Sequence, residues 1–261
     1  SITSSNLDEF FMVRVASLRD MVHADYKKAD IAGMTATEQL EKINVATREL
    51  VELQYSTYNR SLVPQLEAKG IRIIDAFEEL TAEQQEFVDK YFEETVYPVL
   101  TPMAVDASRP FPLIRNKTLN IAAFLLKKGE KKKEENYEFA TVQVPGVLPR
   151  IIPIPDGENH SFILLEQIIE KNMERLFLNY DVICAYPYRI MRNADLTIDE
   201  DEAEDLLQEI QKQLKKRQWG EIIRLEVEDK IDKKLLHFLK EELQIPKDDI
   251  YKINGPLDLT F

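Results

Sequence analysis

The stretch that decides the fold is SSNLDEFFMVRV, residues 4–15, close to the start of the chain. Ser5 with Asp8 fits the capping-box pattern, in which side chains bind the free backbone N–H groups that open a helix. Asn6 with Glu9 fits the same pattern one residue later, and both carboxylates are interpreted as caps. Apolar residues then recur at steps of three or four, at Leu7, Phe11, Val15, Leu18 and Val22. We therefore expect an amphipathic helix that begins here, ends near residue 28 and carries Asn6 at its N-terminus.

A second long helix is expected to follow after Gly33. Thr37 or Thr35 begins it, a core-facing spacing of apolar residues sustains it, and Gly70 ends it, with a kink at Pro64. Two antiparallel helices joined by a short connection predict a helical N-terminal domain over residues 1–75.

Beyond residue 75 the pattern changes, and strands alternate with helices. The passage 98–112 is rich in proline and is expected to be an irregular joint, whereas 119–126 and 137–144 read as a hairpin with a lysine-rich tip. Further strands are expected over 71–74, 151–154, 181–191, 221–227 and 250–253, and further helices over 81–96, 164–178, 197–217 and 233–243. The chain is thus predicted to be α+β, with a head domain over 76–261 built on one main sheet.

Composition narrows the classes of function. The 261 residues carry a net charge of −13, which argues against a nucleic-acid-binding protein because phosphate binding needs clustered Lys and Arg. A polyanionic ligand would require a local basic channel. Cys184 is the only cysteine, and no apolar run approaches the length of a membrane span. We expect a cytoplasmic protein without a transmembrane segment, and leave peripheral membrane association open.

Six segments resemble, in collinear order, the polyphosphate kinases of the first type. They are SSNLDEFFMVRVASL (4–18), YPVLTPMAVD (97–106), FPLIRNKTLNIA (111–122), VQVPGVLPRIIPIP (142–155), NADLTIDEDEAEDLL (193–207) and GEIIRLEVE (220–228). This family moves the terminal phosphate of ATP reversibly onto polyphosphate. The resemblance spans nearly the whole chain and implies an N-terminal plus head-domain fragment that lacks the C-terminal catalytic domains.

The resemblance implies a role for Asn6, which matches the family asparagine that contacts ATP. An amide offers both a donor and an acceptor to a nucleotide, although an asparagine at a helix start is more often only a cap. The family also uses Mg²⁺ and a phosphohistidine. The histidines here, His23, His160 and His237, lack a His-x-Lys context. The nucleophile and the Mg²⁺ ligands are therefore expected outside this chain, and the fragment alone is expected to be inactive on ATP or ADP.

Three basic residues are weaker candidates for contacts to a polyanion or a partner subunit, namely Arg14, Arg115 and Lys117. For Arg14 a surface ion pair is the plainer interpretation, and pairing with a carboxylate of another domain is left open. The acidic run 199–205 is interpreted as the first turns of a helix rather than as a metal site. The expected partners are ATP, polyphosphate and a second copy through the head domain, as a dimer or a dimer of dimers. The alternative is a non-enzymatic α+β module that binds a protein.

Overall fold

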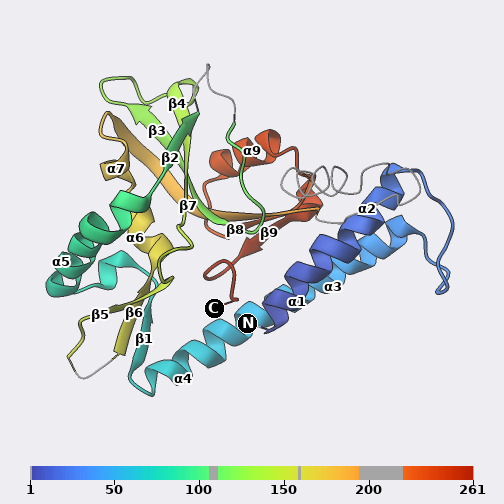
Figure 1. Ribbon diagram of the computed structural model, residues 1–261, viewed down its shortest axis with the longest axis horizontal. Coiled ribbons are helices and arrows are strands. Elements are labelled where there is room, and N and C mark those ends of the chain that lie inside the picture. The colour runs from blue at the N-terminus through green and yellow to red at the C-terminus, as the bar shows by residue number, and fades with distance from the viewer. Residues whose placement is uncertain (1, 106–110, 158–159, 194–219, 261) are drawn as a thin grey trace, which may run out of the picture.

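The computed structural model describes residues 2–105, 111–157, 160–193 and 220–260. A layer of long helices at the N-terminus packs on a mixed sheet domain, as Figure 1 shows. The predicted α+β class is confirmed. The expected helix over 197–217, with its acidic run, lies outside the described residues.

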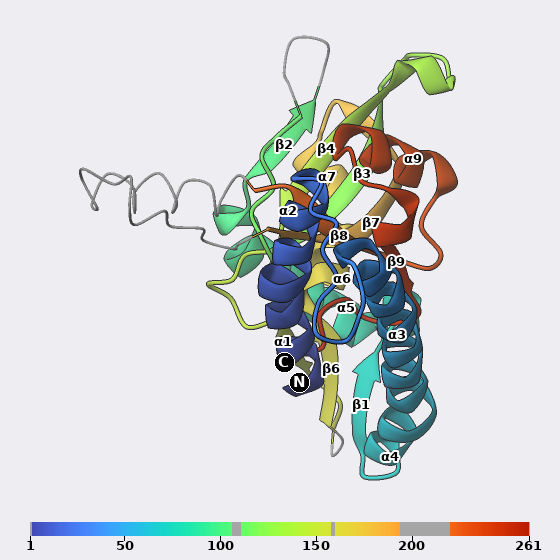
Figure 2. The same cartoon turned by 90° about the vertical axis from the view of Figure 1, so that its right-hand side faces the viewer.

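Two helical rods form the N-terminal layer and lie antiparallel, side by side (Figures 1 and 2). Each is interrupted by one π-helical turn. The first rod consists of α1 (Ile2–Phe10), the π-helical turn Phe11–Val15 and α2 (Ala16–His23). The second consists of α3 (Ala36–Thr57), the π-helical turn Tyr58–Leu62 and α4 (Val63–Glu67). Gly70 adopts a φ of 74°, as expected for a residue that ends a helix.

The helix starts were predicted with mixed success. Thr35 caps α3 through a reciprocal capping box with Glu38, so one of the two expected starts is confirmed. The expected start of the first helix is wrong, because α1 is already helical at Ile2 and Asn6 lies within it. Asp8 is not a cap, since its carboxylate points inward to Arg189. The rod also ends earlier than expected, at His23.

The main sheet has six strands in the order β2-β4-β3-β7-β8-β9. All neighbours are antiparallel except β8 and β9. The strands are β2 (Pro102–Val105), β3 (Leu119–Lys127), β4 (Tyr137–Gln143), β7 (Tyr180–Arg192), β8 (Ile222–Glu228) and β9 (Ile250–Ile253). The predicted hairpin is β3–β4. The expectation of an irregular joint over 98–112 is wrong in part, because β2 pairs there with β4 as an edge strand, a place that tolerates its first residue, Pro102.

A second sheet of three strands was not predicted. It consists of β1 (Ile71–Ile74), β6 (His160–Leu164) and β5 (Ile151–Ile154), in that order. β1 pairs in parallel with β6, so the end of the predicted helical domain joins a strand of the predicted head. The domain boundary at 75/76 stays a prediction. The expected helix over 164–178 is shorter and divided into α6 (Leu165–Lys171) and α7 (Met173–Leu176).

Both faces of the main sheet are covered, which explains why β3 is buried from Leu119 to Leu126. Ile121 and Leu125 point to one face, where they pack with α6 and with α5 (Ala82–Tyr91). Ala122 and Phe124 point to the other face, which α9 (Lys233–Glu242) covers. A third cluster joins the helical rods to the last strands of the sheet, through Phe11, Val15, Ala16, Val51, Tyr55, Met191, Ile223, Tyr251 and Ile253. This third cluster fixes where the first rod lies on the sheet.

Candidate functional site

Asn6 lies on the outer side of α1, away from the sheet. Its side chain is exposed and has no hydrogen-bond partner among the residues that the structure describes. Phe10 and Val13 follow at helical spacing and remain 39% and 50% exposed. The outer face of α1, defined here by Asn6 and Phe10 together with Val13 of the π-helical turn that follows, therefore combines a free amide with apolar surface.

The three basic candidates are placed differently. Arg14 is exposed and donates from Nη2 to Oε1 of Gln39 at 2.8 Å, so its partner in the described part is an amide rather than a carboxylate. Arg115 is exposed, and its carbonyl accepts a hydrogen bond from the Thr118 hydroxyl. Lys117 is brought to α1, where its Nζ lies 3.7 Å from Oδ2 of Asp8.

The residues around Lys117 run beside the first rod, so two of the family-like segments meet in space. Asn116 donates from Nδ2 to the sulfur of Met12 at 3.4 Å. The backbone of Lys117 adopts a φ of 64°, in the left-handed region, and its carbonyl accepts from Nε of Arg189 at 3.3 Å. This local conformation directs the segment toward the buried face of α1.

Behind the outer face, α1 is held by a buried ionic cluster that sequence reasoning missed. Arg189 on β7 binds Asp8 with both guanidinium arms, Nη1 to Oδ1 at 3.1 Å and Nη2 to Oδ2. The two residues are 2% and 3% exposed. Nη1 also donates to Oε2 of Glu226 at 3.1 Å. We call this the Arg189 cluster, and its members are Asp8, Lys117, Arg189, Arg224, Glu226 and Asp258.

Arg224 joins the cluster to the aromatic core under α1. Its Nη2 lies 2.7 Å from Oε1 of Glu226, and its guanidinium lies over the rings of Phe11 and Tyr251, at 4.8 and 4.2 Å from their centroids. The sequence did hold a signal for this cluster. Arg189 and Arg224 interrupt apolar strand patterns, and Asp8 lies on the inward side of an amphipathic helix.

The cluster balances its charges. Burial disfavours the charged form of Arg189, yet the carboxylates of Glu226, Asp8 and Asp258 raise the pKa of Arg189 above its ordinary value. Three cationic side chains face three carboxylates. The cluster therefore has no spare positive charge for a phosphate, and its contacts join Asp8 of α1 to β7.

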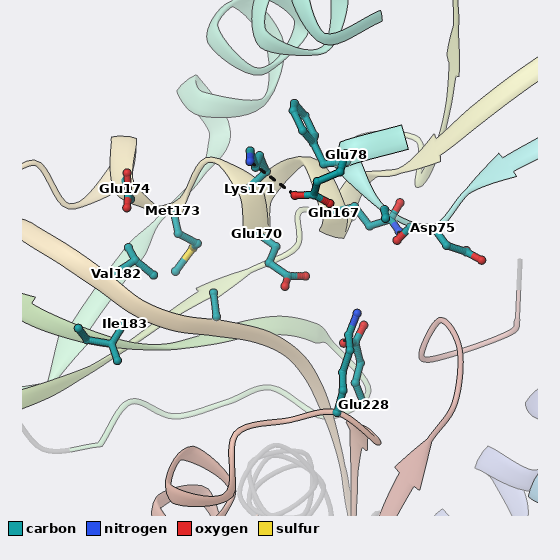
Figure 3. Close-up of a pocket in the computed structure, with 14 residues that line it drawn as sticks. Asp75, Glu78, Gln167, Glu170, Lys171, Met173, Glu174, Val182, Ile183 and Glu228 are labelled. Carbon is teal, nitrogen blue, oxygen red and sulfur yellow. Dashed lines mark hydrogen bonds and ion pairs between the residues drawn. The ribbon is translucent and has the colours of Figure 1, made fainter. Parts of the chain in front are cut away.

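A separate cavity of about 670 Å³ lies between α6, β7 and the ends of β1 and β8. Figure 3 shows the carboxylates of Glu170 and Glu228 pointing into it, with Lys171 paired to Glu78 at 3.8 Å. None of the four sequence-predicted candidates lines it. Among the residues that the structure describes, no three His, Cys, Asp or Glu side chains form a metal site. Mg²⁺ binding stays a prediction about sequence outside this chain.

Because of a buried carboxyl group in this cavity, we expect the free energy of unfolding to depend on pH. Burial, and then the nearby Glu228 carboxylate, raise the pKa of Glu170 from 4.5 to about 8. The folded chain therefore keeps a proton that the unfolded chain releases, so the free energy of unfolding falls as pH rises from 4.5 to about 8. This one group contributes a slope of up to about 1.4 kcal/mol per pH unit.

Glu170→Gln should flatten that slope, as measured by urea unfolding at a series of pH values. Glu174→Gln is the matched control, because Glu174 lines the same cavity but is exposed. An equal slope in wild type and Glu170→Gln would contradict the assignment.

This architecture matches that of a known protein family. The polyphosphate kinase N-terminal domain model matches residues 1–74, and the polyphosphate kinase middle domain model matches residues 83–261. The crystal structure of the polyphosphate kinase from Porphyromonas gingivalis superimposes with a TM-score of 0.73 at 23% identity, over 98% of this chain and 34% of that chain. The fold is thus that of the N-terminal and middle domains of a polyphosphate kinase.

Sequence similarity to polyphosphate kinases leads to the same family. The polyphosphate kinase of Bacillus anthracis is 48% identical over 100% of this chain and 37% of its own length. That of Lactiplantibacillus plantarum is 49% identical over 100% of this chain and 36% of its own length. The chain belongs to the polyphosphate kinase family, and it spans about 37% of the length of these relatives. No helix in the described ranges is long and apolar enough to cross a membrane.

Proposed function

We propose that this chain is the N-terminal and head part of an enzyme that transfers the terminal phosphate of ATP reversibly to polyphosphate. In this reaction a histidine attacks the γ-phosphorus, the bond to ADP breaks, and the phosphoryl group then moves to the terminal oxygen of polyphosphate. His23, His160 and His237 are exposed and stand outside a His-x-Lys context, so the nucleophile is assigned to sequence beyond these 261 residues. Catalysis of phosphoryl transfer is mainly positioning and charge stabilisation, so this part alone is inactive.

The exposed amide of Asn6 is the observation that carries the proposal. On the outer face of α1 it lies free of partners in the described part, beside the exposed side chains of Phe10 and Val13. A nucleoside presents both polar edges and a flat apolar surface, and this face offers a match for each. We assign it as one wall of the ATP pocket, which the rest of the enzyme completes.

The remaining roles follow from the same proposal. Arg115, which is exposed, is a contact to polyanion or to a partner subunit, as is Arg14. Lys117 is a weaker choice because it already faces Asp8. The head domain forms the interface of a dimer or dimer of dimers, Mg²⁺ is bound by groups outside this chain, and the enzyme acts in the cytoplasm.

Asn6→Ala in the full-length protein tests the pocket assignment. We expect KM for ATP to rise about tenfold, the effect of losing one hydrogen bond to the nucleotide. The thermal midpoint should be unchanged, because an exposed amide without a described partner adds little to stability. Glu9→Ala, an exposed change on the neighbouring turn, is the control. Unaltered ATP kinetics in Asn6→Ala would contradict the assignment, and a full-length protein with no ATP turnover would favour a protein-binding module.

A further inference from the structure

We propose that Asp8 and Arg189 are positioning residues that hold α1 in one register on the sheet, so that its outer face presents Asn6 to the nucleotide. The inference rests on the proposed function, and it adds residues that do not touch ATP. Asp8 and Asn6 are two positions apart on α1 and therefore point to nearly opposite sides of the helix, about 200° apart. A contact at Asp8 thus fixes the direction of Asn6 without occupying the nucleotide side.

Arg189 is a rigid anchor for this contact. It lies in β7, where it pairs with Leu119 of β3 on one side and Glu226 of β8 on the other. Its guanidinium is held at every edge, by Asp8, by Glu226 and by the carbonyl of Lys117. A two-armed contact from a fixed guanidinium defines both the height and the rotation of α1, which a single hydrogen bond would not.

The π-helical turn over 11–15 shows why α1 needs such a contact. A π-helical turn adds one residue to a helix, so α1 is rotated by about 100° relative to the position that an uninterrupted helix would give it. Relaxation of this turn would rotate Asn6 by the same angle. The apolar contacts of Phe11 and Val15 are not directional and lie within the turn itself. The Asp8–Arg189 pair is the two-armed contact of α1 beyond the turn, where α1 also accepts a single hydrogen bond, from Nε2 of Gln54 to Oγ of Ser4 at 2.6 Å.

The decisive experiment is a double-mutant cycle in the full-length protein. Asp8→Asn keeps the size of the side chain and removes its charge, and we expect it to raise KM for ATP about tenfold while kcat stays within about twofold. In an Asn6→Ala background the same change should add nothing further to KM, because Asp8 acts through Asn6. Independent, multiplying effects of the two changes would overturn the proposal.

A second variant separates positioning from stability. Replacing a buried ion pair by apolar side chains of similar volume often preserves stability, so Asp8→Leu/Arg189→Met should fold with a thermal midpoint near that of wild type. It should nevertheless keep the raised KM for ATP, and amide hydrogen exchange over residues 2–15 should be faster. Gln84→Ala is the control, because it removes a buried amide of α5 that donates to the carbonyl of Pro155 at 2.8 Å, at a place away from α1. It should lower stability without changing KM or exchange over 2–15.

The outcomes distinguish the two proposals. If Asn6→Ala raises KM but Asp8→Asn does not, the positioning role is wrong and the pocket assignment stands. If Asn6→Ala is silent, the pocket assignment is wrong. Unchanged exchange over 2–15 in Asp8→Leu/Arg189→Met overturns the positioning role whatever the nucleotide kinetics show.

Discussion

Phe92→Ala is expected to lower the free energy of unfolding by about 3–5 kcal/mol, since it removes a fully buried aromatic ring. The ring lies in the core between the main sheet, α6 and the second sheet. The guanidinium of Arg175 stacks 5.1 Å from its centroid, and Tyr97 meets it edge-on at 6.0 Å. These neighbours belong to different elements, so collapse onto the cavity would require several of them to move together. Urea unfolding followed by circular dichroism measures the loss.

Phe87→Ala supplies the control in α5, which leads directly into the π-helical turn Phe92–Val96 that carries Phe92. Phe87 stacks on Tyr91 at 6.4 Å between centroids but is 36% exposed, so its loss should cost less than about 1 kcal/mol. A similar loss from both changes would mean that the buried position of Phe92 does not carry the stability assigned to it.

Local signals in the sequence predict most of the elements. Each capping box spans four residues, from Thr35 to Glu38 and from Thr81 to Gln84, and each begins a helix as expected. The hairpin β3–β4 follows from two apolar runs around a charged turn. In each case the interacting groups are neighbours in the chain, so their pattern alone specifies the structure.

Elements that depend on distant partners were missed. β2 is four residues long and is a strand only because β4 pairs with it, and β6 is defined by β1 and β5 on its two sides. Asp8 fits a capping box as a local pattern, but Arg189, 181 residues away, binds it more strongly as a charged pair. A strong tertiary contact of this kind overrides the structure that the neighbouring residues favour.

Of the candidate site, the sequence indicated the exposed residues and missed the buried cluster behind them. Asn6 was singled out through the resemblance, and the structure places it on an exposed face, within α1 rather than at its first residue. Of the basic candidates, Lys117 reaches α1, whereas Arg14 and Arg115 make no hydrogen bond or ion pair with the Arg189 cluster among the described residues. Because the cluster joins α1, β7 and β8, no single stretch of sequence could have shown it.

Arg189→Met alone is expected to lower the free energy of unfolding by about 3–5 kcal/mol, because it leaves two carboxylates buried without their shared partner. Asp8 and Glu226 are almost fully buried, and the partners left to them are Lys117, 3.7 Å from Asp8, and Arg224, 2.7 Å from Glu226. Asp8→Leu/Arg189→Met should recover much of the loss, since it removes the carboxylate that lost its two-armed partner and fills its place with apolar atoms. Urea midpoints of wild type and both variants measure these differences. Equal losses in the single and double variants would show that the arginine contributes packing rather than charge balance.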